Sequence, residues 1–253
     1  MSTPIIVVLA LLAWQLYINV SGISKFVLPS PWEVFGAFFH MIQQPYIWQL
    51  HVWTTLVETI LGFIIGFLLG VTGGYLMGKF RPVEAIANPF VVASQVVPKV
   101  ALVPLFILWF GFDISSKIAI ASLLAFFPIL VNTSFGIRSV SPAMGEMMTS
   151  LRATMWQRFR KLEIPHMTPY VLTGAEMGMI LSLIGAIVGE YLAGDRGLGR
   201  LAVQLQNDLQ VPELYGSILL MTLLGFALYS IFAVLRRVLI PWHESVLIRQ
   251  RDS

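Results

Sequence analysis

Cysteine is absent from this chain of 253 residues, which excludes disulfides and thiolate metal sites. Charge is scarce as well, because Asp, Glu, Lys and Arg make up 11% of the residues, against roughly a quarter in soluble domains. So few charges cannot cover a water-facing surface when 57% of the residues are hydrophobic. We therefore predict an integral membrane protein with a single domain over residues 1–253. The net charge of +3 gives no reason to expect a nucleic-acid partner.

Residues from which catalytic and metal centres are built are also few. The histidines are too scattered for metal-ligand spacing: His40, His51, His166 and His243. No Ser/His/Asp set is credible, and the phosphate-binding pattern G-x-x-x-x-G-K-[ST] does not occur. The sequence thus predicts no metal, no cofactor and no catalytic activity of its own.

Long apolar runs are what the chain has instead. A helix needs about 20 mainly apolar residues to cross the hydrocarbon core, and unpaired backbone groups are not tolerated there. These features predict an all-α membrane protein with about six transmembrane helices and a transmembrane core over residues 54–240. The six predicted segments are Thr3–Val20, Thr54–Gly78, Pro89–Phe110, Ser115–Gly136, Val171–Leu192 and Leu214–Ile240.

Prolines and glycines mark two of these segments. Pro89, Pro98 and Pro104 fall in the third, which we expect to be kinked or interrupted, either lining a cavity or packing as a bent helix. The second has glycines four residues apart, at Gly62, Gly66 and Gly70, which permits close helix packing. We expect that packing within one subunit rather than at a dimer interface. The spacing is partly repeated in the fifth segment.

The basic residues predict the orientation. With the N-terminus in the cytoplasm, eleven of the sixteen Lys and Arg residues lie on the cytoplasmic side, so both termini and residues 137–170 are predicted to be cytoplasmic. The eleven are Lys79, Arg81, Arg138, Arg152, Arg158, Arg160, Lys161, Arg236, Arg237, Arg249 and Arg251. Tryptophans near predicted helix ends indicate membrane-interface anchors: Trp14, Trp32, Trp48, Trp53, Trp109 and Trp242.

Between the fourth and fifth segments, Gly145 to Pro165 forms a polar, basic stretch. Met147, Met148, Leu151 and Met155 lie at i, i+1, i+4 and i+8 and predict one apolar helix face. Four basic residues flank it, at positions 152, 158, 160 and 161. Two interpretations stand at this point: a helix lying on anionic lipid, or a surface that docks a partner with acidic residues.

The same stretch resembles the EAA loop of binding-protein-dependent ABC importer permeases. The family pattern is Glu-Ala-Ala, three residues, Gly, nine residues and Ile-x-Leu-Pro. Glu146, Met147, Met148, Arg152, Ala153, Phe159 and the sequence Leu-Glu-Ile-Pro ending at Pro165 occupy this region. Arg152 stands where the family has its glycine, in a bend between two short helices, where positive φ is needed.

Four further stretches resemble the nitrate/sulfonate/taurine branch of that family, in family order, so that the match runs from about residue 28 to Trp242. They are Leu28–Pro31, Val97–Leu105 with Trp109–Gly111, Phe126–Thr133, and Gly189–Tyr191 with Gly197–Gly199. The resemblance implies a type I, MetI-like permease fold in the bacterial inner membrane. It also implies that a solute delivered by an extracytoplasmic binding protein passes between two permease copies.

The resemblance further implies that separate cytoplasmic ATPase subunits, two of them, drive transport and bind a coupling helix in residues 137–170. The residues implied for coupling are Glu146, Met147, Met148, Leu151, Arg152, Ala153, Met155, Phe159 and Pro165. The family's solutes include sulfonates, nitrate and taurine, and ring compounds such as pyrimidine precursors, riboflavin and aromatic carboxylates. The stretch Ala93–Lys99, together with Glu58, is most similar to members that handle ring compounds.

Polar groups inside apolar segments are the candidates for the solute path, because ionisable groups in lipid are costly. They are Gln95, Lys99, Glu58, Asn132 and Glu190. For each one a structural role is an equal alternative: Lys99 can snorkel to the interface, and Asn132 can bond a neighbouring helix. The competing function is a membrane channel or enzyme subunit without an ATPase, which would need a charged filter ring or a catalytic cluster.

Overall fold

The computed structural model describes residues 2–240. Within them every regular element is a helix. Five helical stretches are long and apolar enough to cross a membrane, and a bent pair of helices supplies a sixth if it is counted as one span. The prediction of about six spans is therefore confirmed, whereas Trp242, Arg249 and Arg251 lie outside the described residues. The five stretches are Pro4–Ser21, Pro45–Lys79, Ile114–Arg138, Met155–Ala193 and Val211–Arg236.

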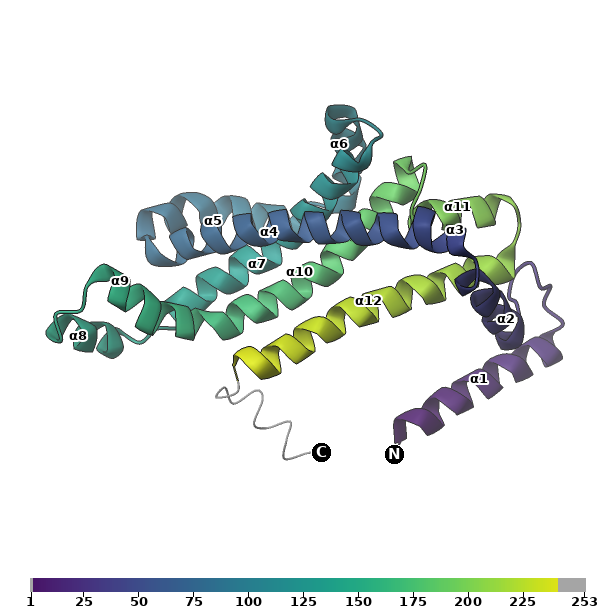
Figure 1. Ribbon diagram of the computed structural model, residues 1–253, viewed down its shortest axis with the longest axis horizontal. Coiled ribbons are helices and arrows are strands. Elements are labelled where there is room, and N and C mark those ends of the chain that lie inside the picture. The colour runs from purple at the N-terminus through teal and green to yellow at the C-terminus, as the bar shows by residue number, and fades with distance from the viewer. Residues whose placement is uncertain (1, 241–253) are drawn as a thin grey trace. The chain divides into compact units, whose positions relative to one another are not determined.

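The elements are mostly α-helices, interrupted by short 3-10 and π turns (Figure 1). In order they are α1 (Ser2–Ser21), α2 (Pro31–Ile42), α3 (Pro45–Ile47), η1 (Trp48–Val52), α4 (Trp53–Lys79), α5 (Arg81–Val96), η2 (Lys99–Leu102), α6 (Val103–Phe110), α7 (Ile114–Arg138), α8 (Pro142–Ser150), α9 (Met155–Arg158), η3 (Phe159–Glu163), α10 (Ile164–Ala193), α11 (Leu198–Asn207) and α12 (Val211–Leu239).

The predicted break in the third segment is confirmed, but only one proline makes it. Arg81–Val96 and Lys99–Phe110 are bent by 94° across Val97 and Pro98. Pro89 lies inside a continuous α5, and Pro104 lies in the first turn of α6, where a missing N–H costs no hydrogen bond. The expected interruption therefore lies at Pro98, and neither Pro89 nor Pro104 interrupts its helix.

The residues cluster into two compact units, and α4, α10 and α12 contribute to both. The first consists of the chain up to residue 55 and residues 190–224, and its core joins Met41, Ile47, Val52, Leu198, Leu201, Leu205 and Leu220. Ser30 caps α2 through a capping box with Glu33.

The second unit consists of residues 56–189 and the chain from residue 225, and α7 forms its centre. A Cβ on Gly66 of α4 would lie 2.7 Å from the carbonyl oxygen of Ser122, and one on Gly74 would lie 2.5 Å from that of Leu130. The other neighbour of α7 approaches as closely, because a Cβ on Gly185 of α10 would lie 2.8 Å from the Cα of Ala121. The glycines thus permit backbone contact within one chain, as predicted.

Candidate functional site

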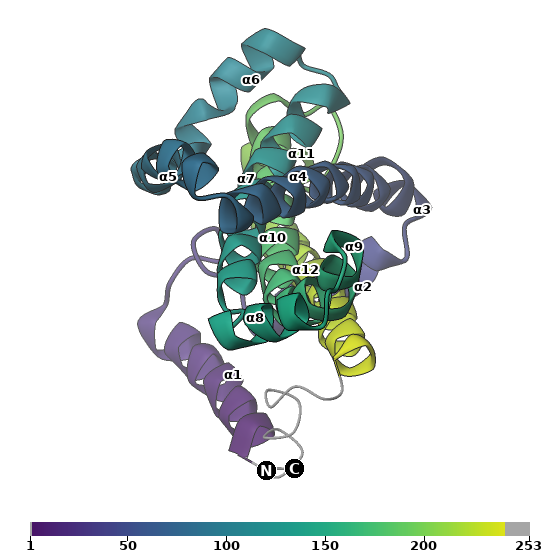
Figure 2. The same cartoon turned by 90° about the vertical axis from the view of Figure 1, so that its left-hand side faces the viewer.

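The polar stretch after α7 folds into two short helices joined by a tight bend. Ser141 caps α8, with Pro142 in its first turn, and Leu151 ends the helix. Thr154 then caps α9 through a capping box with Gln157. In Figure 2, α8 and α9 lie at the near ends of α7 and α10.

Arg152 makes the bend itself. Its φ is 53°, in the left-handed region that glycine occupies at little cost. The amide of Ala153 returns to the carbonyl of Met148 at 3.0 Å, and the amide of Arg152 bonds the carbonyl of Thr149 at 2.9 Å. The backbone therefore has the conformation for which the family pattern has glycine, although the side chain is arginine.

One predicted feature of this stretch is wrong. Met155 is not on the same helix as Met147, Met148 and Leu151, because α8 ends at Ser150 and the chain reverses before α9. A large exposed apolar surface nevertheless forms. Met147 is 55% exposed, Leu151 69%, Met155 81% and Trp156 65%. We call these four residues the docking surface.

Trp156 was missed by the sequence interpretation, which assigned tryptophans to the membrane interface. The available signal was that Trp156 lies within the basic stretch and far from the ends of the predicted apolar segments. Arg152, Arg160 and Lys161 are exposed around the same segment, so the docking surface has a basic rim.

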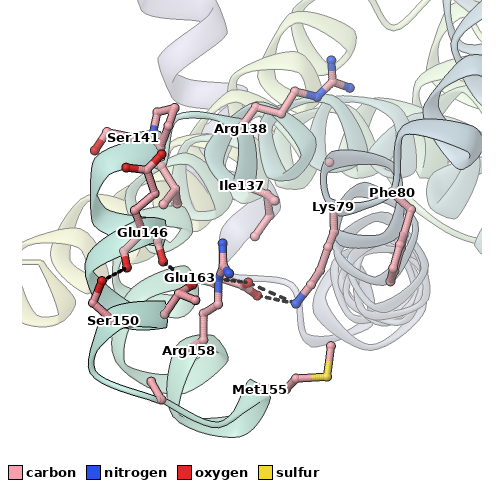
Figure 3. A pocket seen from close by; sticks show the side chains of 16 residues that line it. Lys79, Phe80, Ile137, Arg138, Ser141, Glu146, Ser150, Met155, Arg158 and Glu163 are labelled. Carbon is pink, nitrogen blue, oxygen red and sulfur yellow. Dashed lines mark hydrogen bonds and ion pairs between the residues drawn. The ribbon is translucent and has the colours of Figure 1, made fainter.

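Met155 of the docking surface also lines a cavity of about 880 Å³ between α8, α9 and the ends of α4 and α7. Its lining includes Glu146, Ala153 and Met155, together with the buried Glu163. Figure 3 shows Lys79 and Arg158 reaching Glu163 from two sides. Phe159 and Pro165 are half-buried where this segment joins α10.

Lys79 Nζ lies 3.0 and 2.9 Å from the two carboxylate oxygens of Glu163, and the Tyr75 hydroxyl donates to the same group at 2.8 Å. Arg158 Nε lies 3.8 Å from it. A buried carboxylate is tolerated when it is paired and hydrogen-bonded in this way.

The predicted solute-path residues do not form one cluster. Gln95 is exposed at the end of α5, where it lines a small cavity of about 180 Å³ with Ser134 and Arg138 of α7. Lys99 lies beyond the bend, with its ammonium 5.2 Å from the ring centre of Phe127.

Asn132 donates to the carbonyl of Pro128 in its own helix at 2.8 Å, and not to a neighbouring helix as its structural alternative proposed. Glu58 is buried within α4. Glu176, a further acidic residue of the fifth segment, forms an ion pair with Arg236 of α12.

Glu190 is wholly buried in the first unit. Its carboxylate accepts a hydrogen bond from the Thr55 hydroxyl at 2.6 Å and from the amide of Gly199 at 2.7 Å. His51 Nδ1 lies 2.8 Å from the carbonyl oxygen of Gly197, which lies in the loop between α10 and α11. The geometry of Glu190 is that of an anchor for the loop between α10 and α11.

A family model and several similar proteins all indicate a membrane component of a transport system. Residues 62–244 match the family described as binding-protein-dependent transport system inner membrane component. The riboflavin transport system permease RibX of Chloroflexus aurantiacus is 35% identical over 96% of this chain and 90% of that protein. The formylaminopyrimidine transport permease ThiX of Halalkalibacterium halodurans is 33% identical over 91% of both.

The putative aliphatic sulfonates transport permease SsuC of Bacillus subtilis is 30% identical over 92% of this chain and 84% of that protein. Among solved structures, the inward-facing MetNI methionine ABC transporter superposes with a TM-score of 0.62 at 20% identity. That match covers 77% of this chain and 98% of the matched chain, and it shows a shared fold.

Proposed function

This chain belongs to the family of binding-protein-dependent transport system inner membrane components, and from that premise we propose that its docking surface binds a cytoplasmic ATPase subunit. The chain is a multi-pass membrane permease of an ABC importer with a MetI-like fold. We propose that ATP hydrolysis belongs to the partner. We further propose that two copies of the chain enclose the solute path and bind two ATPase subunits and an extracytoplasmic binding protein.

The observation that carries the docking proposal is the exposed apolar surface of Met147, Leu151, Met155 and Trp156. Methionine side chains adapt to a groove whose shape changes during a cycle, and exposed patches of this kind mark interaction sites. The stretch from Met155 to Ala193 has 39 residues, about twice what is needed to cross the hydrocarbon core, so its ends must extend beyond it. The basic rim can form ion pairs with acidic residues of the ATPase partner.

Purification of the tagged chain from its native membranes in mild detergent tests the docking proposal. We expect Mg-ATP hydrolysis to co-purify, and an azido-ATP photolabel to mark the attached subunit. The paired substitution of Met147→Ser and Leu151→Ser removes two exposed apolar side chains and should release that activity. Phe112→Ser, an equally exposed apolar residue outside the docking surface, is the matched control. Undiminished ATPase with the paired substitution contradicts the proposal.

For the solute, we propose a nitrogen-containing ring compound within the small organic and anionic solutes of the family. The support is that the relatives named for riboflavin and formylaminopyrimidine are 35% and 33% identical to this chain, against 30% and 31% for two relatives named for aliphatic sulfonates. Lys99, Gln95, Glu58, Asn132 and Glu190 remain proposed path residues. Uptake by proteoliposomes that contain the whole transporter, with riboflavin, a formylaminopyrimidine and taurine in parallel, tests the solute class. Uptake of taurine alone contradicts it.

A further inference from the structure

A π-helical turn joins the docking surface to α10. This turn, η3, consists of five residues from Phe159 to Glu163, and turns of this type occur frequently at functional sites. Its first and last residues both contact Tyr75 of α4. The ring of Phe159 packs edge-on against Tyr75 with 5.3 Å between ring centres, and Glu163 accepts the Tyr75 hydroxyl hydrogen bond at 2.8 Å. The turn therefore contacts α4 through an aromatic and a polar group at once.

The carboxylate of Glu163 also lies close to two cations, one on each side. Only 8% of the Glu163 side chain is exposed, and it lies between Lys79 in the last turn of α4 and Arg158 in α9. The guanidinium of Arg158 also covers Gly145 of α8, where a Cβ would lie 2.9 Å from Nη2. One carboxylate thus joins Arg158 of α9 to Lys79 of α4.

The aromatic contact begins at the docking surface itself. The ring centre of Trp156 lies 5.6 Å from that of Phe159, which in turn packs on Tyr75. Two parallel connections therefore lead from the docking surface to the last two turns of α4. The glycines of α4 also bring its backbone directly against α7.

We propose that Glu163 is a positioning residue that transmits movement of the docking surface to α4, so that α4 and α7 move when the ATPase closes. This inference rests on the docking proposal above. It predicts that loss of the carboxylate charge separates two events that are coupled in the native protein: ATPase binding persists, but α4 no longer responds to nucleotide.

The absence of cysteine permits a direct test, because Leu76→Cys supplies the chain with a single thiol. Leu76 is partly exposed on α4, one turn before Lys79. The spectrum of a spin label at this position is recorded in the complex with its ATPase, first without nucleotide and then with ATP and vanadate. The complex without the introduced cysteine is treated with the same label, and its spectrum is subtracted as background. We expect a nucleotide-dependent change of the label's mobility.

In Glu163→Gln we expect the ATPase to co-purify while that change falls roughly threefold or more. Lys79→Met should have the same effect, the double variant should be no worse, and Lys79→Arg should retain the response. The matched control is Glu84→Gln, which breaks a different ion pair, between Glu84 and Arg138. It should leave the response unchanged.

Two outcomes overturn the inference. A full spectral response in Glu163→Gln shows that α4 is moved by other contacts, and loss of the ATPase in that variant shows that the carboxylate builds the docking surface itself. Failure of the docking proposal is recognised separately, because the wild-type chain would then carry no ATPase.

Discussion

Replacing Gly197 by alanine tests how the loop between α10 and α11 is held. Gly197 has φ 97° and ψ 166°, a combination that is essentially restricted to glycine. A Cβ at this position would lie 2.1 Å from the carboxyl carbon of Glu190. The substitution therefore strains the backbone and displaces the carboxylate that accepts the Thr55 and Gly199 hydrogen bonds.

The backbone strain and the displacement of the carboxylate can be separated with Gly111. It has nearly the same backbone conformation, φ 80° and ψ −177°, and none of the residues that the structure describes lies within 4 Å of an added Cβ there. Gly111→Ala should cost the backbone strain alone, about 1–3 kcal/mol. Gly197→Ala should cost about 1–3 kcal/mol more, which is the usual penalty for forcing a side chain into a filled site.

Thermal unfolding of the detergent-solubilised protein measures both variants. At about 2–4 °C per kcal/mol, Gly197→Ala should unfold roughly 2–12 °C below Gly111→Ala. Glu190→Ala in the Gly197→Ala background provides the space for the added methyl group and should reduce the difference. Equal unfolding temperatures for the two alanine variants would show that the Glu190 carboxylate moves aside freely, and would refute its role as an anchor.

Two further predictions concern the bend between α8 and α9 and the start of α2. In denaturant unfolding, the Arg152→Gly variant should be more stable than Arg152→Ala by up to about 1 kcal/mol, because only glycine relieves the strain of the left-handed φ. The greater conformational freedom of glycine in the unfolded chain offsets part of this gain. Glu33 lies 2.5 Å from Lys25 and accepts hydrogen bonds from Ser30, which lowers its pKa from 4.5 to about 2. Its contribution to stability is therefore complete above about pH 4.5 and is lost as the pH falls towards 2, so that Glu33→Gln should flatten the unfolding temperature over that range. An unchanged pH profile would contradict the assigned pairing.

Much of the fold could be predicted because the bilayer imposes it. Spans of about 20 apolar residues must be helices, and the six predicted segments correspond to five long helices and one bent pair. The break at Pro98 was predicted, but the sequence could not indicate which prolines are tolerated. Pro104 needs no amide partner because it begins a helix, and Pro89 lies within a helix that continues past it.

The stretch that forms α8 and α9 shows where helix periodicity fails as a predictor of which residues share a face. Met147 and Met155 share a face only on an uninterrupted helix, and the interruption depends on the left-handed φ of Arg152, a conformation that arginine rarely adopts. A family pattern with glycine at this position indicates the bend more reliably than the arginine itself does. Trp156 was overlooked because its location depends on the same bend.

The membrane environment, the helical class and the family follow from composition, apolar length and motif order, which are properties of the chain alone. The roles of the polar residues became visible in the fold, because their partners are distant in sequence. Glu163 finds Lys79 across 84 residues, and Glu190 finds Thr55 across 135. Burial makes a carboxylate costly without such partners, so its role follows from what the fold brings to it.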